Sequence, residues 1–255
     1  MSLAGKVVIV TGASSGIGAA TAEAFAKQGS KVVLTGRNQA NLKSTEAACK
    51  TANSNVELLV IAADVTTDAE KIIKTTIDKF GQLDVLVNNA GMGKWGSILD
   101  IDVDQFDLVM NTNLRSVFLL TKYAAPHLVK TQGSIVNVSS VAGLRSFEGI
   151  SVYCTSKAAL DQFTRCIALD LAPKNVRVNA VNPGVIVTEF HKRLGFSDEE
   201  DAKFLEHSKT THALGRVGEP NEVADAIIFL ASDSSSFITG ATLPIDGGRH
   251  AMCPR

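Results

Sequence analysis

Two side chains with acid/base chemistry, Tyr153 and Lys157, lie four residues apart in the run Tyr-Cys-Thr-Ser-Lys. If this run is helical, the phenol and the ammonium share one face, because residues i and i+4 stack along a helix. A protonated lysine beside tyrosine stabilises the phenolate and brings proton exchange closer to neutral pH. The spacing therefore predicts an acid/base pair, although it is equally compatible with two polar residues on a solvated helix face.

A glycine-rich turn near the start of the chain could hold a phosphate. Gly12, Gly16 and Gly18 follow an apolar run and precede a helical pattern, in the segment Thr-Gly-Ala-Ser-Ser-Gly-Ile-Gly. Backbone amides and a helix N-terminus at such a position can receive a pyrophosphate. The spacing is GxxxGxG rather than GxGxxG, so the cluster taken alone could also be a tight turn.

Arg37 follows the second apolar run, where a dinucleotide-binding unit contacts the adenosine ribose. An acidic residue there accepts a hydrogen bond from the 2'-hydroxyl of NAD, whereas an arginine binds the 2'-phosphate of NADP. The second apolar run ends Thr35-Gly36-Arg37 without a carboxylate. The sequence therefore favours NADP(H), with an ordinary surface arginine as the alternative.

Short apolar runs rich in β-branched residues alternate with longer helical patterns. The expected strands are residues 6–11, 31–35, 56–62, 85–88, 134–139, 177–181 and 241–245. The expected helices are residues 16–28, 40–52, 69–80, 103–130, 153–171 and 221–231. The strand runs are apolar on both faces, as expected when helices cover both sides of a parallel sheet. This pattern predicts a doubly wound α/β fold.

The segment from about residue 185 to 216 departs from this alternation. It is long and rich in charge, with apolar residues such as Phe190 and Phe204 spaced through it. A long excursion after a sheet strand often forms a lid or a binding loop, but a surface excursion with a small core of its own fits as well.

Composition excludes several classes of function. The chain has 255 residues, 45% of them hydrophobic, and a formal net charge of -1 with both signs interspersed. This length suits one well-buried core, and nothing marks a linker, a nucleic-acid footprint or a membrane span. The four cysteines lack metal-ligand or disulfide spacing, and no signal-peptide pattern begins the chain. We expect a cytoplasmic protein without a metal.

The chain resembles the short-chain dehydrogenase/reductase family along essentially its whole length. The resemblance is specific because independent motifs occur in the family's order. Besides the glycine turn these are Asp64-Val65, Asn88-Asn89-Ala90-Gly91, Asn113-Leu114, Ser140, Tyr153 with Lys157, Asn182-Pro183-Gly184 with Thr188, and Asp246-Gly247-Gly248. The resemblance implies a single Rossmann-like domain over residues 1–255, with seven parallel strands in the order 3-2-1-4-5-6-7. It also implies a nicotinamide cofactor, hydride transfer between an alcohol and a carbonyl, and a homotetramer.

The resemblance also implies which residues bind the cofactor. Asp64 would accept a hydrogen bond from the adenine amine and Val65 would donate its backbone amide, unless Asp64 caps the next helix instead. Asn89, Ala90 and Gly91 would pass over the adenosine ribose, or form a structural turn, or do both. The remaining expected contacts are Gly12, Ser14, Ser15, Gly16, Ile17, Gly18, Arg37, Tyr153, Lys157, Pro183, Gly184, Ile186 and Thr188.

Three residues of the family pattern would carry out the reaction, two of them in contact with the substrate carbonyl. Ser140 would hydrogen-bond the reacting oxygen, and its thirteen-residue spacing to Tyr153 selects it over the adjacent Ser139. Tyr153 would donate a proton to that oxygen or remove it. Lys157 would hold the nicotinamide ribose and lower the pKa of Tyr153.

Asn113 resembles the family asparagine that bends the helix before the fifth strand and holds a water molecule linking Lys157 to solvent. The nearby Asn111 leaves the register open, but an interior asparagine is otherwise unfavourable in a helix, which favours Asn113. Cys154, beside the tyrosine, faces away from it on a helix and is interpreted as a packing residue.

The substrate pocket would have an apolar character by family position. Its expected members are Ser140, Tyr153, Met92, Trp95, Leu144, Phe147 and Phe190. We therefore expect a medium-sized hydrophobic ketone or secondary alcohol, such as a steroid, an isoprenoid or another lipid-like compound. Arg145 could bind an anionic substrate tail or simply face water. The alternatives are a 3-oxoacyl-thioester reductase and, in another class, a non-catalytic NADP(H)-binding sensor or scaffold.

Overall fold

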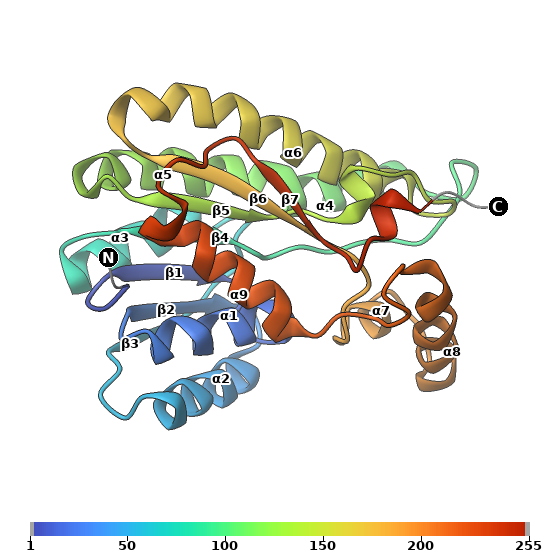
Figure 1. Cartoon of the computed structure of the whole chain (residues 1–255), viewed down its shortest axis with the longest axis horizontal. Coiled ribbons are helices and arrows are strands. Elements are labelled where there is room, and N and C mark those ends of the chain that lie inside the picture. Colours follow the sequence, from blue (N-terminus) through green and yellow to red (C-terminus); the bar gives the residue numbers. More distant parts are fainter. Residues whose placement is uncertain (1–2, 253–255) are drawn as a thin grey trace.

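A computed structural model describes residues 3–252 and contains one seven-stranded parallel sheet. Its strands are β1 (Val7–Thr11), β2 (Lys31–Gly36), β3 (Leu58–Ala62), β4 (Val85–Asn88), β5 (Ser134–Val138), β6 (Arg177–Pro183) and β7 (Thr242–Ile245). They are ordered β3-β2-β1-β4-β5-β6-β7, which confirms the doubly wound fold expected from the sequence. Figure 1 shows the twisted sheet between two layers of helices.

Helices cover both faces of the sheet because successive strand residues are apolar on opposite sides. One layer holds α1 (Gly16–Lys27), α2 (Gln39–Ala52) and α9 (Pro220–Ala231). The other holds α3 (Ala69–Phe80), α4 (Val103–Met110), α5 (Ser116–Thr131) and α6 (Ser151–Leu171). In β1, Val8 and Val10 pack into the first layer, whereas Val7 and Ile9 pack into the second. The result is two buried cores that hold the strand ends in place.

The sequence predicts one helix over residues 103–130, but the structure shows a helix that is not regular throughout. It consists of α4, a π-helical turn at Asn111–Arg115, and α5, joined without a break. A π turn accommodates one extra residue within a helix and is often found at functional sites. The extra residue here falls in the turn that contains Asn113.

The excursion after β6 contains two helices, α7 (Phe190–Arg193) and α8 (Asp198–Ser208), which lie beyond one end of the sheet (Figure 1). Ser197 and Glu200 form a capping box that starts α8. The excursion is closed at its base, where Gly218 N donates to Val185 O and Val187 N donates to Gly218 O, both at 2.9 Å. Its two ends are therefore fixed to each other while its helices project from the sheet.

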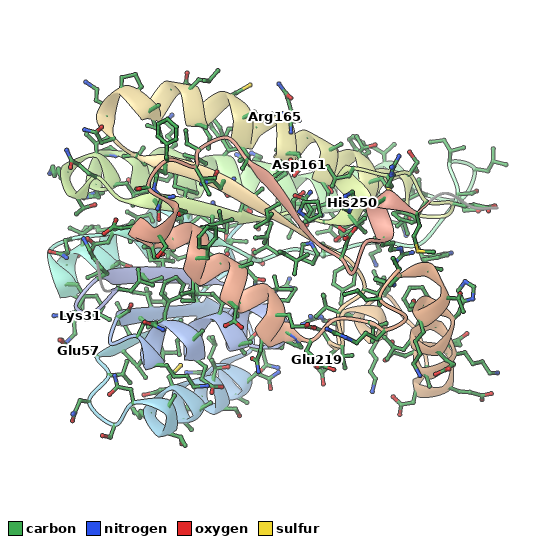
Figure 2. The ribbon with its side chains drawn as sticks, viewed as in Figure 1. Lys31, Glu57, Asp161, Arg165, Glu219 and His250 are labelled. Carbon is green, nitrogen blue, oxygen red and sulfur yellow. The ribbon has the colours of Figure 1, made fainter. Side chains whose placement is uncertain are left out.

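Ion pairs tie some strand ends together at the opposite edge. Lys31 lies at the start of β2, and its Nζ is 2.8 Å from Oε1 of Glu57, just before β3 (Figure 2).

Within residues 3–252, the helices are all too short or too polar to cross a bilayer.

Candidate active site

A cavity of about 710 Å³ lies at the carboxyl edge of the sheet. Its walls include residues one or two positions after six of the strands, among them Arg37 after β2, Asp64 after β3, Ser140 after β5 and Gly184 after β6. In open α/β sheets, ligands bind at this edge, near the point where the strand order reverses. The topology therefore brings residues from distant parts of the sequence to one continuous site.

The glycine turn between β1 and α1 forms part of this cavity. Gly12 and Gly16 have φ angles of +65° and +54°, a region that favours glycine. Asn89 braces the turn, because its Nδ2 donates to the carbonyl oxygen of Thr11 at 2.8 Å. Gly18 does not line the cavity; a Cβ there would overlap the Gly12 carbonyl oxygen and lie 2.5 Å from Asn89 Nδ2. Gly18 thus permits close packing of helix and turn, and a Cβ at Gly12 or Gly16 would also crowd its neighbours, Asn89 and Thr188.

Arg37 and Asp64 form an ion pair at the β2 and β3 end of the cavity, with 3.6 Å between Nη1 and Oδ2. The Arg37 side chain is 77% exposed, so its guanidinium is accessible to a ligand. Burial alone would raise the pKa of Asp64, but hydrogen bonds from Thr66 and the charge of Arg37 outweigh it and hold this pKa below its usual value.

The suggested alternative role of Asp64, capping the next helix, does not describe its position. The residue before α3 is Asp68, and its carboxylate accepts a hydrogen bond from Asp64 N at 2.9 Å. The Asp64 carboxylate instead accepts from the backbone and hydroxyl of Thr66, at 2.9 and 2.7 Å. Asp64 therefore organises the turn that leads to α3.

Ser140, Tyr153 and Lys157 come together where β5 meets α6. Ser140 lies two residues beyond β5, which ends at Val138 rather than at residue 139. Its hydroxyl is hydrogen-bonded with Tyr153. Lys157 Nζ donates to the carbonyl oxygen of Val138 at 2.8 Å and lies 5.8 Å from the centroid of the Tyr153 ring. Ser139 points elsewhere and donates to the Lys157 carbonyl oxygen at 3.2 Å.

Burial dominates the electrostatics of this group. It raises the pKa of Tyr153 to about 12, against the hydrogen bond from Ser140, which favours the phenolate. It lowers the pKa of Lys157 to about 8, against the charge of the buried Asp161. The pKa of Tyr153 is therefore above its usual value, because removing the phenolate from water costs more than the hydrogen bond from Ser140 returns.

Asn113 is buried and links three parts of the site. Its Oδ1 accepts from Met92 N at 2.9 Å, while its Nδ2 donates to Met92 O at 2.8 Å and to Ser156 Oγ at 3.0 Å. Ser156 in turn donates to the carbonyl oxygen of Tyr153 at 2.7 Å. Asn111, the other candidate for this position, is exposed. The π turn thus directs Asn113, and not Asn111, toward the loop after β4 and the start of α6.

Comparison with known proteins identifies the family. Residues 12–250 match the family described as Enoyl-(Acyl carrier protein) reductase. The chain is 39% identical to the 3-oxoacyl-[acyl-carrier-protein] reductase FabG of Thermotoga maritima, with 97% of this chain and 99% of the relative covered. It is 38% identical to the meso-2,3-butanediol dehydrogenase of Serratia marcescens, with 96% and 95% covered. The crystal structure of levodione reductase superposes with a TM-score of 0.92 at 33% identity, covering 97% of this chain and 98% of that one.

The chain belongs to the short-chain dehydrogenase/reductase family. Members of this family are oxidoreductases that act on CH-OH groups with a nicotinamide cofactor. The cavity of this short-chain dehydrogenase/reductase (SDR) fits such a cofactor. The glycine turn lines the cavity, and the Arg37 side chain is accessible after β2. The cavity is also lined by all the expected cofactor contacts except Gly18.

The expected SDR substrate residues lie around the same cavity, with one exception. Met92, Trp95, Phe147 and Phe190 line it, as do Ser140 and Tyr153. The ring centroids of Tyr153 and Phe190 are 5.7 Å apart, so α7 reaches the catalytic tyrosine of the family pattern. Leu144 is not part of the wall, because the turn after β5 directs it toward the surface.

Several polar residues of the site were not found by sequence reasoning. Arg193 of α7 donates from Nη1 to Ser15 Oγ at 2.9 Å and so connects the excursion to the glycine turn. Asp161 lies beneath Lys157, one helical turn further along α6, and a search for acids at i+4 would have found it. Lys94 and Arg249 also line the cavity. Arg249 had only one sequence signal, its place directly after Asp246-Gly247-Gly248.

Arg145 is exposed and does not line the cavity. Its Nε donates to the carbonyl oxygen of His250 at 2.7 Å. It therefore attaches the last turn of the described chain to the loop after β5.

Proposed function

We propose that this SDR is an NADP(H)-dependent reductase of a medium-sized hydrophobic ketone, of the steroid, isoprenoid or lipid-like kind, and also oxidises the corresponding secondary alcohol. The observation that carries the proposal is the hydrogen-bonded pair of Ser140 and Tyr153 beside the buried Lys157. These groups share one cavity with the accessible guanidinium of Arg37 and with apolar side chains from three loops.

The nicotinamide would supply or accept a hydride at the carbon atom of the carbonyl. Ser140 would donate a hydrogen bond to the carbonyl oxygen and orient it. Tyr153 would donate its hydroxyl proton to that oxygen, and a pKa of about 12 keeps this phenol protonated at neutral pH. Lys157 would stabilise the phenolate that remains, because its ammonium is fixed near the ring by the Val138 carbonyl. Asn113 would hold Met92 and Ser156, which frame the tyrosine.

Tyr153→Phe tests the acid role. It removes one hydroxyl and preserves the ring that packs on Phe190. We expect kcat to fall at least 1000-fold in an assay that follows NADPH absorbance, while NADPH still binds, because the hydroxyl that would donate the proton is removed. Turnover near the wild-type rate would rule out Tyr153 as the acid.

Arg37→Ala tests the cofactor preference. A charge-assisted hydrogen bond contributes about 1.5–3 kcal/mol, so the variant should bind NADPH about 10- to 100-fold more weakly. Its affinity for NADH should change little, because the 2'-phosphate is absent there. A wild-type preference for NADH, or unchanged NADPH affinity in the variant, would contradict the assignment.

The similarity to FabG supports a second candidate, reduction of a 3-oxoacyl thioester. The two are separated by comparing kcat/KM on acyl-carrier thioesters and on free ketones of equal chain length. A non-catalytic NADP(H) sensor is disfavoured because Asn113, Ser140, Tyr153 and Lys157 are all present, and a sensor does not need a proton donor.

We also infer that the protein forms a homotetramer through its long helices and last strand. Exposed apolar side chains on α4, α5 and α6 support this, since Phe106, Phe118 and Leu169 are 42%, 47% and 76% exposed. Light scattering after size exclusion chromatography measures the assembly. Part of the tail considered for this interface, residues 253–255, lies outside the described residues.

A further inference from the structure

A cation lies in the substrate part of the cavity, where the other large side chains are mostly apolar. Arg249 follows β7 in the short 3-10 turn Arg249–Ala251. Its guanidinium carbon is 4.7 Å from the centroid of the Phe147 ring, and both residues line the cavity. Phe147 belongs to the loop that begins at Ser140, so Arg249 stands beside the loop that carries the proposed catalytic serine.

The surrounding turn holds Arg249 in place. The Asp246 carboxylate accepts hydrogen bonds from Gly248 N at 3.0 Å and from His250 N at 2.6 Å. On the other side, Arg145 binds the carbonyl oxygen of His250, the residue labelled in this turn in Figure 2. Gly248 has a φ of +82°, which lets the chain turn back over the cavity. A cation fixed in this way loses less conformational entropy when it binds a ligand.

The hydrogen-bond donors of this guanidinium have no protein partner within the described range of residues 3–252. No carboxylate lies within 4.0 Å of it there, and Asp246 is engaged by the turn and by His250 Nδ1. Stacking on Phe147 uses the face of the guanidinium, whereas its N–H groups point outward in its plane. The donors are therefore available to a ligand. Burial lowers the pKa of Arg249, against the charge of Asp246, because the guanidinium is partly removed from water.

The other charged residues near the substrate do not neutralise Arg249. Lys94 lines the same cavity and adds a second positive charge. Glu148 also lines the cavity, but it is exposed and forms no ion pair with either cation among the described residues. The charge of Asp246 offsets only part of the cost of burying Arg249, and a bound anion would offset more of it.

We propose that the substrate is an oxo acid or hydroxy acid whose carboxylate binds Arg249 while its apolar part contacts Phe147 and Phe190. This inference rests on the proposed carbonyl reduction and specifies its substrate class. It makes the substrate amphipathic, with the reacting carbonyl near Tyr153 and the charge at the turn after β7. A planar guanidinium and a carboxylate can pair through two parallel hydrogen bonds, which gives both affinity and orientation.

The test compares acids with their neutral esters. Oxo acids from pyruvate to 6-oxoheptanoate, and the methyl ester of each, are assayed with NADPH against the wild type, Arg249→Gln and Arg165→Gln. Arg165→Gln is the matched control, because Arg165 lies on α6 outside the cavity and donates to Gln162 (Figure 2). For at least one chain length, wild-type kcat/KM should be about 10- to 100-fold higher for the acid than for its ester, mainly through KM.

Arg249→Gln should remove this preference, with a loss for the acid at least tenfold larger than the loss for the ester, and Arg165→Gln should retain it. Esters that react as well as acids throughout the series, or equal losses for both in Arg249→Gln, would overturn the proposal.

Binding separates this proposal from the proposed reaction. Saturated carboxylates from propanoate to heptanoate are titrated by calorimetry into the NADPH complex of the wild type and of Arg249→Gln. Binding to the wild type that is lost in the variant supports the carboxylate site even if no oxo acid is reduced. Absence of binding across the series overturns it. If the wild type prefers oxo acids to their esters while Tyr153→Phe retains activity, the proposed role of Tyr153 as proton donor fails and the carboxylate site stands.

Discussion

Replacing Asn113 by alanine should reduce both the stability and the activity of the protein. The change removes three hydrogen bonds within a site that is only 1% exposed, and leaves the N–H and C=O groups of Met92 without these partners. Each such bond contributes about 0.5–1.5 kcal/mol net, so the free energy of unfolding should fall by about 2–4 kcal/mol. Activity should fall as well, since Asn113 binds Ser156, which holds the Tyr153 carbonyl.

Urea denaturation of the wild type, Asn113→Ala and Asn111→Ala measures this difference. Asn111 lies in the same π turn but is exposed, so its replacement should change the unfolding free energy by less than about 0.5 kcal/mol. The two variants share the same loss of an amide in the same helical turn. Equal effects on stability would refute the reasoning, because the loss would then reflect helix propensity and not the buried hydrogen bonds.

Two further predictions concern packing and titration. Gly18→Ala should destabilise the fold by about 1–3 kcal/mol and weaken NADPH binding, because the added Cβ would overlap the Gly12 carbonyl oxygen. Thermal melts with and without NADPH measure the stability and the binding. An unchanged melting temperature would contradict this prediction. Lys157 has a folded pKa of about 8, below its unfolded value, so the folded chain releases this proton first. The wild type should therefore gain stability relative to Lys157→Met between about pH 8 and 10.5, by up to about 3 kcal/mol in urea titrations. If the difference in unfolding free energy between the two proteins does not vary with pH, the lowered pKa of Lys157 is contradicted.

The doubly wound sheet and the position of the cavity could be predicted from short-range patterns in the sequence, whereas the strand order was implied by the family resemblance. Apolar runs on both faces indicate a covered parallel sheet, and the motifs after the strands must meet at its carboxyl edge. The π turn could not be predicted in the same way. Its position depends on hydrogen bonds from Asn113 to Met92 and Ser156, which are distant along the chain.

The electrostatics of the site were also beyond sequence reasoning. The spacing of Tyr153 and Lys157 predicted their proximity, but the pKa values depend on how deeply α6 buries them. Arg249 illustrates a third limit. Its position beside Phe147 arises only when the last turn folds back onto the loop after β5, and no local pattern encodes that contact.

The π turn at Asn111–Arg115 means that the site depends on the length of a helix as well as on its residue types. A π turn corresponds to an α-helix with one residue inserted. Deleting Thr112 would let α4 and α5 continue as one regular helix whose flanking residues keep their faces, but the widened turn that directs Asn113 toward Met92 and Ser156 would be lost. Every strand and helix could then still form, while the links from Asn113 to Met92 and Ser156 could not. In this chain a single-residue deletion, without any change of side chain, would separate folding from function.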